Sequence, residues 1–151
     1  MKRYNSIQEF EKKGNAVVTI GTFDGVHLGH RKILTRLCEL AAKQNGESVV
    51  LTFFPHPRMV LHPDDHGLKL LNTLEERIAL ISQLNIAHVI VQPFTKEFSH
   101  QSSVEFVRDV LLHALGTKTL VIGYDHHFGH NREGTYKALE ELALGYGFGL
   151  E

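Results

Sequence analysis

The feature that most constrains the fold of this chain is its alternation of short β-branched runs with amphipathic stretches. Runs rich in Val, Ile and Thr are typical of buried strands, and segments with an apolar repeat near 3.6 residues lie between them. Strands and helices that alternate with short connections favour a parallel sheet. We therefore predict an α/β fold with a doubly wound parallel sheet, in which right-handed crossovers place helices on both faces.

The positions of the expected elements follow from these patterns. Strands are expected at 16–20, 48–53, 88–91 and 119–122, with another opening at 148–150. Helices are expected from about 31 to the Asn45-Gly46 pair, from Thr73 to about 84, over about 102–115 and over about 136–144. The helix at Thr73 begins with a capping box, because Glu76 follows three residues later. Residues 55–72 show little periodicity, and we expect a long irregular loop that carries function.

The bulk composition excludes several classes of protein. A length of 151 residues suits one domain, and a net charge of −1 gives no electrostatic footprint for nucleic acid or an anionic membrane. The apolar runs are far shorter than the roughly 20 residues that span a bilayer, and the polar start is unlike a signal peptide. The single cysteine, Cys38, excludes an internal disulfide. We therefore expect a cytoplasmic protein that binds neither nucleic acid nor membranes.

Residues 21–30 follow the first expected strand, at the end of a parallel sheet where ligands bind. This segment lacks the GxGxxG fingerprint, and the chain lacks the Gly-Lys-Ser/Thr of a P-loop. Instead, His27 and His30 lie three apart on one side of a first helical turn, with Gly29 leaving room for close approach. A helix N-terminus attracts anions, so these residues predict electrostatic stabilisation of a phosphoryl group. Capping or solvated histidines are the plainer alternative, and a zinc site is disfavoured because structural zinc needs four ligands.

The sequence Gly-Thr-Phe-Asp-Gly-Val-His-Leu-Gly-His at 21–30 resembles the HxGH signature of the nucleotidyltransferase superfamily, whose sheet is Rossmann-like. That superfamily includes cytidylyltransferases, several adenylyltransferases and bacterial FAD synthetases. The resemblance implies that His27 and His30 are catalytic, contacting the nucleotide triphosphate and stabilising the transition state at its α-phosphorus. It also implies an ATP site that these histidines share with Gly21, Thr22, Phe23, Asp24 and Gly29.

Two further motifs resemble FAD synthetases in particular. Thr-Phe-Phe-Pro-His-Pro at 52–57 ends the second expected strand, where prolines fix the backbone and Phe rings offer flat apolar surface to a flavin. Gly-Tyr-Asp-His-His-Phe-Gly at 123–129 resembles a later family element, although His126 stands where the family usually has Phe. The resemblance implies a flavin site formed by Phe54, Pro55, His56, Pro57, Asp125 and Phe128. A buried Phe pair with a rigid turn, and a strand-end loop with solvated histidines, are the structural alternatives.

Aromatic residues later in the chain also match the family. Phe94, Phe98 and Phe106 resemble a family stretch with Phe at similar spacing. We expect these rings to be core aromatics, and Phe98 with its loop is a candidate wall for the flavin.

The resemblance implies transfer of AMP from ATP to FMN, giving FAD and pyrophosphate. The FMN phosphate attacks the α-phosphorus, and no protein base is needed because this nucleophile is already an anion. Mg²⁺ is expected to accompany ATP, and Asp125 is a candidate to assist it. No metal ligand is assigned from the sequence. Another HxGH nucleotidyltransferase, and a non-catalytic nucleotide- or flavin-binding module, are the alternative functions.

The resemblance extends along the whole chain and predicts that the chain is a fragment. FAD synthetases carry a second phosphate-binding element, of the form I-S-S-(S/T)-x-I-R, shortly after the fifth strand, and a riboflavin kinase domain usually follows. Both would lie beyond Glu151. We therefore expect residues 1–151 to form an FMN adenylyltransferase domain, truncated at its C-terminus, of a bifunctional riboflavin kinase/FAD synthetase. This part alone is expected to bind nucleotide poorly or to be inactive, and the sequence does not predict an oligomeric state.

Overall fold

A six-stranded parallel sheet forms the centre of the protein. The structure is a computed structural model that describes residues 1–12, 14–24, 28–64, 72–123 and 135–151. The strands lie in the order β1-β4-β3-β2-β5-β6, and every neighbouring pair is parallel. They are β1 (Lys2–Tyr4), β2 (Ala16–Ile20), β3 (Glu47–Phe54), β4 (His88–Pro93), β5 (Thr117–Val121) and β6 (Gly149–Leu150). The predicted parallel sheet is confirmed, and each predicted strand corresponds to one of β2 to β6.

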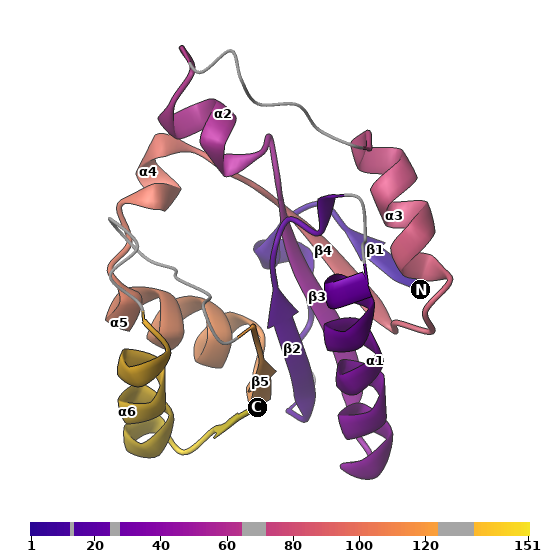
Figure 1. Cartoon of the computed structure of the whole chain (residues 1–151). Coiled ribbons are helices and arrows are strands. Elements are labelled where there is room, and N and C mark those ends of the chain that lie inside the picture. The colour runs from indigo at the N-terminus through magenta and orange to yellow at the C-terminus, as the bar shows by residue number, and fades with distance from the viewer. Residues whose placement is uncertain (13, 25–27, 65–71, 124–134) are drawn as a thin grey trace.

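Helices cover both faces of the sheet, as the alternation predicts (Figure 1). One face is covered by α1 (Leu28–Lys43) and α3 (Leu74–Ser82), and the other by η3 (Phe106–Ala114) and α6 (Tyr136–Tyr146). All five side chains of β2 are buried, because a strand at the centre of such a sheet faces a core on each side. None of the helices in the described part of the chain is long and apolar enough to cross a membrane.

The two cores are built from alternate residues of the same strands. Val17 of β2 packs with Leu34 and Leu37 of α1 in the core on one face. Val18 lies in the core on the other face with Leu139 of α6. Successive side chains of a strand point to opposite faces, so the continuous apolar runs in the sequence supply both cores at once.

The chain reverses its direction of travel across the sheet at β2. From β2 it passes through α1 to β3 and through α3 to β4, and then it returns to the other side of β2 to form β5 and β6. The connections after β2 and β5 therefore leave in opposite directions. Such a switch point opens a crevice outside the carboxyl ends of the two strands, which is where doubly wound sheets bind ligands. The start of α1 lies at this crevice.

The sequence pattern does not reveal several short elements. β1 adds an edge strand beside β4, and η1 (Ile7–Glu9) follows it. α4 (Lys96–Ser99) follows β4, with Thr95 as its N-cap. These elements are too short to show a pattern, because a helical period needs a window of about 11 residues and a strand pattern needs about four.

Two expectations from the sequence need correction. The stretch 55–72 was expected to be irregular, but it contains α2 (Pro57–Leu61), which begins with a proline at a position that suits it. The helix expected over 102–115 is present, but only its start, α5 (Ser103–Glu105), is α-helical, and η3 is a π-helix. Helical periodicity does not separate these two forms, because both bury one face of the segment.

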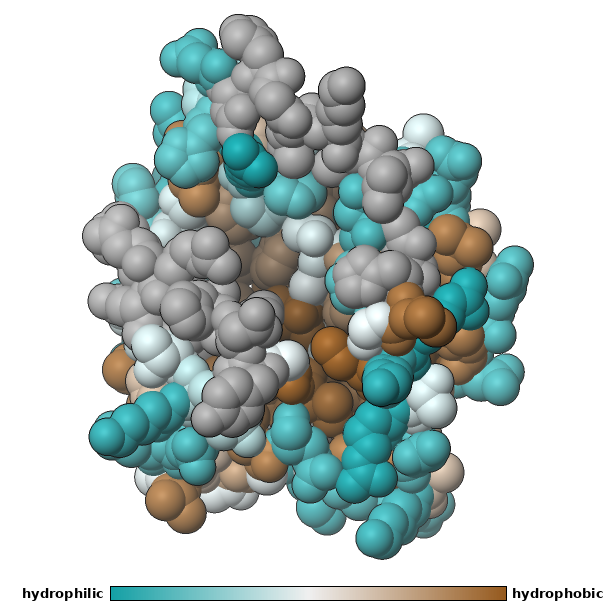
Figure 2. All heavy atoms as spheres, viewed as in Figure 1, coloured by the Kyte–Doolittle hydropathy of each residue, from teal (hydrophilic) through white to brown (hydrophobic). Residues whose placement is uncertain are grey.

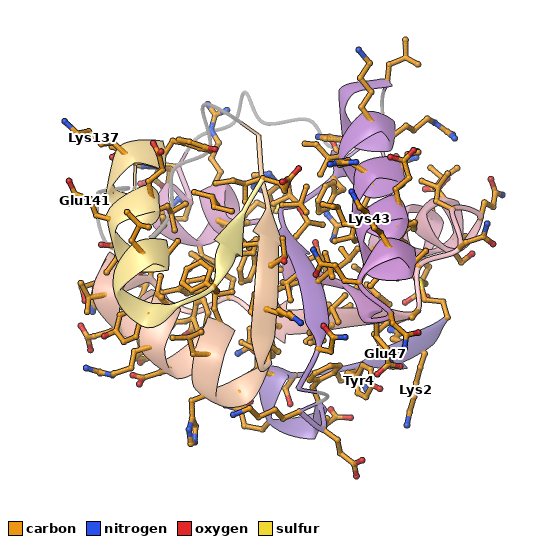
Figure 3. All side chains as sticks on the ribbon, turned by 90° about the horizontal axis from the view of Figure 1, so that it is seen from below. Lys2, Tyr4, Lys43, Glu47, Lys137 and Glu141 are labelled. Carbon is orange, nitrogen blue, oxygen red and sulfur yellow. The ribbon has the colours of Figure 1, made fainter. Side chains whose placement is uncertain are left out.

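A chain of polar contacts near the amino end of the sheet runs from the buried Tyr4 through His88 to the partly exposed Glu47. The Tyr4 hydroxyl lies 3.0 Å from Nδ1 of His88, and Nε2 of His88 lies 2.9 Å from Oε1 of Glu47. The tautomer with its hydrogen on Nε2 satisfies both contacts, because Tyr4 then donates to His88 and His88 donates to Glu47. These residues join β1, β4 and β3, and Figure 3 shows Tyr4 and Glu47 close together in the view from below.

Candidate active site

The turn after β2 places the first predicted site residues at the carboxyl edge of the sheet. The Gly21 N–H donates to the Leu51 carbonyl at 3.0 Å, so the pairing of β2 with β3 continues past the end of β2. The Thr52 hydroxyl donates to the Thr22 carbonyl at 3.4 Å. Both bonds tie the predicted nucleotide-binding turn to β3, the strand that leads to the predicted flavin-binding residues.

Phe23 supports the ring of His30 from below. The two ring centroids lie 5.2 Å apart, and the rings meet edge to face at 75°. Phe23 is only 3% exposed and has a φ of 53°. This left-handed conformation costs a residue with a side chain about 1–2 kcal/mol, and strained residues of this kind cluster at binding sites. The ring fits because Gly21 has no Cβ, which would lie 3.0 Å from Cε2 of Phe23.

His30 lies half-buried on the first turn of α1, with the exposed Gly29 beside it. The first turn of α1, from Leu28 onward, carries no acidic side chain. The N–H groups at this helix end and the positive end of its dipole are therefore directed at the crevice without a neighbouring carboxylate on the same turn. This arrangement suits a phosphate group, with the His30 imidazole as a further donor.

The predicted flavin-binding residues leave the sheet at the end of the adjacent strand, β3. Phe54 is 49% exposed, and a cis peptide bond joins it to the exposed Pro55. Pro57 begins α2, and Nδ1 of His56 accepts the N–H of Arg58 at 3.1 Å as the N-cap. The structure therefore brings this loop and the Gly21 turn to one edge, on neighbouring strands.

The pKa of His56 lies below its usual range. Burial is the main cause, and the charges of Arg77 and Arg58 act in the same direction, while the carboxylate of Asp24 acts against them. A neutral imidazole also agrees with the contact at Nδ1, because only an unprotonated ring nitrogen accepts a hydrogen bond.

A cluster of aromatic rings is centred on Phe53, the residue before Phe54 in β3. Phe53 contacts Phe94 and Phe98, with ring centroids 5.6 and 5.7 Å away, and Phe98 contacts Phe106 at 6.3 Å. These rings pack against the main core, which confirms the prediction of core aromatics. Phe94 and Phe98 remain half-buried, so the cluster also has an outer side. Figure 2 shows apolar side chains in a hollow at the centre of this face, near the carboxyl end of β2 in Figure 1.

Arg77 is a residue at this edge that the sequence reasoning missed. Its side chain comes from α3 and is 4% exposed, and Nη2 donates to the Phe53 carbonyl at 3.3 Å. Oδ1 of Asp24 accepts the N–H of Asn72, just before α3, at 3.1 Å. A sequence pattern that could have found it is present, because Arg77 shares the helical spacing of Leu74, Ile78 and Ile81 and so lies on an apolar face.

Some predicted residues lie outside the described residues. These are His27 of the histidine pair and both Asp125 and Phe128 of the third motif.

Among the described residues, no three His, Cys, Asp or Glu side chains come together as a metal site. Asp24 offers one carboxylate at the crevice, and Mg²⁺ usually takes only one or two carboxylates together with phosphate oxygens and water. The described residues therefore fit a metal that arrives with a nucleotide better than a metal held by the protein alone.

Comparison with known proteins agrees with this geometry. The family model described as FAD synthetase matches residues 9–151. The bifunctional riboflavin kinase/FMN adenylyltransferase of Buchnera aphidicola (subspecies Schizaphis graminum) is 34% identical over 98% of this chain and 47% of its own length. The Escherichia coli K12 protein of the same name is 34% identical over 89% of this chain and 42% of its own length. The Pseudomonas fluorescens protein of that name is 36% identical over 89% and 43%.

Two solved structures share the fold. A crystal structure of a macrolide-efflux protein from Streptococcus pneumoniae has a TM-score of 0.81 at 23% identity, covering 99% of this chain and 49% of that one. Pantothenate synthetase from Thermus thermophilus has a TM-score of 0.63 at 15% identity, covering 100% of this chain and 60% of that one.

The switch-point crevice, the helix N-terminus with His30 and the aromatic strand exit together define an α/β protein of the nucleotidyltransferase type. With the match to 9–151 added, the chain belongs to the FAD synthetase family, as its motifs predict. The chain spans a little under half of the length of the curated relatives described above.

Proposed function

We propose that this chain transfers AMP from ATP to FMN, giving FAD and pyrophosphate, as the adenylyltransferase part of a longer protein that also carries a riboflavin kinase domain. The observation that carries the proposal is the placing of two unlike surfaces at neighbouring strand ends. One is the helix N-terminus with His30, which suits phosphates, and the other is the exposed ring of Phe54 at the end of β3. The names of the relatives support this pairing of a nucleotide with a flavin.

The phosphate side would act by position and charge. ATP would lie with its phosphates against the first turn of α1, where His30 donates to them and Phe23 fixes the ring. The oxygen of the FMN phosphate forms a bond to the α-phosphorus while the bond from that phosphorus to the β-phosphate oxygen breaks, and pyrophosphate leaves. His27 is proposed to act with His30 in stabilising the added negative charge. Mg²⁺ that enters with ATP would supply further neutralisation of phosphate charge.

The flavin side would act by holding the nucleophile in place. The exposed ring of Phe54 offers a flat surface, and Pro55, His56 and Pro57 give the loop a restricted backbone. Phe98, half-buried in the cluster around Phe53, is a candidate further wall for the flavin. Asp125 and Phe128 are proposed as the remaining flavin contacts.

The test is the formation of FAD from ATP and FMN by the full-length protein and by two histidine variants of it. We expect His30→Ala to lower turnover by about 10²–10³-fold, the loss measured when one charge-stabilising donor is removed, while FMN binding changes little. His113→Ala is the matched control, because His113 is an exposed residue of η3 on the other face of the sheet. Unchanged turnover in both His30→Ala and His27→Ala would contradict the proposed role.

A further inference from the structure

We propose that Arg77 is a positioning residue that holds the nucleotide-binding turn and the flavin-binding loop in fixed relation, so that the two substrates meet in line. This inference rests on the proposed adenylyl transfer. It concerns a side chain to which neither the motifs nor the comparisons assign a role. The geometry that carries it is the junction of α3 with the two segments that leave β2 and β3.

The burial of Arg77 is the first step. Its side chain lies on the apolar face of α3 among Leu74, Ile78 and Ile81, at 4% exposure. A guanidinium in such a place loses water, and burial lowers the pKa of Arg77 from its ordinary value. Apolar residues of similar volume fill such positions without this cost, and they are often equally or more stabilising. Packing alone therefore does not require a cation here.

The contacts of Arg77 are the second step. Nη2 donates to the carbonyl of Phe53, directly before the flavin-binding loop begins at Phe54. The carboxylate of Asp24, at the end of the nucleotide-binding turn, is the charge that favours protonated Arg77. Asp24 is also bonded to the start of α3, since Oδ1 accepts the N–H of Asn72 at 3.1 Å. One end of α3 thus contacts both segments.

The third step is the point at which the pairing of β2 with β3 ends. The pairing of β2 with β3 ends at Ile20 and Leu51, apart from the additional bond of Gly21. Phe54 itself is held by β4, since it pairs with Pro93. The turn that carries Asp24 is tied to β3 by the Thr52 hydroxyl, and Arg77 adds a hydrogen bond to the Phe53 carbonyl together with the attraction between its charge and the Asp24 carboxylate. Reacting groups that are displaced by about 1 Å can lose about 10²-fold in rate.

The rate of FAD formation tests this role in three variants of the protein. We expect Arg77→Met to lower kcat by about 10- to 100-fold while the KM values for ATP and FMN change by less than about threefold, because alignment is lost and binding is kept. We expect Arg77→Lys to recover little of kcat, because an ammonium on a flexible stem keeps the charge but does not hold the Phe53 carbonyl as the planar guanidinium does. Arg108→Met is the matched control, since Arg108 is exposed on η3 and pairs with the adjacent Asp109.

A second measurement separates charge from alignment. Among the described residues, the charged groups that act on His56 are Arg77 of α3, Asp24 of the nucleotide-binding turn and Arg58 of α2. In an NMR titration of the His56 ring, we expect Arg77→Met to raise its pKa, Asp24→Asn to lower it and Arg77→Lys to leave it near the wild-type value. Arg77→Lys should therefore restore the electrostatics of the site without restoring turnover.

Three outcomes would overturn the proposal. These are full turnover in a folded Arg77→Met protein, full turnover in Arg77→Lys, and KM changes that account for the whole loss. If Arg77→Met does not fold, the kcat of Arg77→Lys decides. Full-length wild-type protein that formed no FAD would contradict the proposed function instead. Thermal unfolding would then test the contact between α3 and the two segments. If the Tm shifts of Arg77→Met and Asp24→Asn simply add in the double variant, the proposed link between these residues is contradicted.

Discussion

At the scale of single residues, the candidate site depends on the fit of one aromatic ring over one glycine. Gly21 lies against the ring of Phe23, and the same ring supports His30. In Gly21→Ala the new methyl group would lie 3.0 Å from Cε2 of Phe23, which is closer than ordinary van der Waals contact. The Phe23 ring must then give way by a few tenths of an ångström, and this ring also contacts His30. We expect turnover to fall by about tenfold, since small displacements of a catalytic group are costly, and steady-state kinetics measures it.

The control for this substitution lies in α6. Gly145 has open space where a Cβ would be added, and it lies inside the helix, so Gly145→Ala should raise the free energy of unfolding by about 0.5–1 kcal/mol. Its turnover should equal that of the wild type. A Gly21→Ala protein with wild-type turnover and an unshifted His30 ring signal in NMR would show that the support of His30 by Phe23 does not matter.

At the scale of elements, long segments with a clear apolar period can be predicted from the sequence. Short segments that depend on a partner distant in sequence cannot. β2, α1 and α6 are long enough for their apolar pattern to show, and the capping box at Thr73 is present as predicted, with both of its bonds. β1 has three residues and gains its pairing only from β4, which is distant in sequence. Such a strand is visible only once the partner strand is placed.

The candidate site shows the same limit. A motif contained in one segment, such as the turn from Gly21 to His30, could be found because its residues are adjacent in sequence. The part played by Arg77 could not be found in this way, because its partners Phe53 and Asp24 belong to other segments. Sequence periodicity places Arg77 on a buried face, but only the packing of α3 on the sheet shows which groups it contacts there.

The edge strand β1 supports a prediction at this scale. Tyr4→Phe removes the hydroxyl that contacts Nδ1 of His88, and this nitrogen would remain buried without its partner. Leaving a buried acceptor unsatisfied costs about 1–3 kcal/mol, so we expect a loss of that size in the free energy of unfolding by denaturant. Tyr146→Phe is the control, because Tyr146 is 42% exposed at the end of α6. Equal stability of Tyr4→Phe and Tyr146→Phe would mean that the contact between the Tyr4 hydroxyl and His88 does not stabilise β1.

At the scale of the whole molecule, the shifted pKa values set how stability depends on pH. Bonds from the backbone and side chain of Thr73 lower the pKa of Glu76, and bonds from Ser102 lower that of Glu105. Burial lowers the pKa of His56 and raises that of Cys38. A lowered pKa means that the unfolded chain binds more protons, so stability falls as the pH drops below the unfolded value. A raised pKa means that the folded chain binds more protons, so stability falls as the pH rises through the pKa of the folded state.

The unfolding free energy should therefore be greatest between about pH 6.5, where an unfolded histidine titrates, and about pH 8.5, where an unfolded cysteine does. On the acid side, His56 would begin the decline, and the two capping glutamates would steepen it below about pH 4.3. Glu76→Gln keeps an oxygen that can accept the Thr73 N–H but cannot titrate, so it should make the acid limb shallower. In the double variant, which also carries Glu105→Gln, the acid limb should become shallower again by a similar amount. Unfolding by denaturant from pH 3 to pH 9 measures the free energy of unfolding at each pH. If the double variant has an acid limb of unchanged slope, the caps of α3 and α5 do not link protonation to folding.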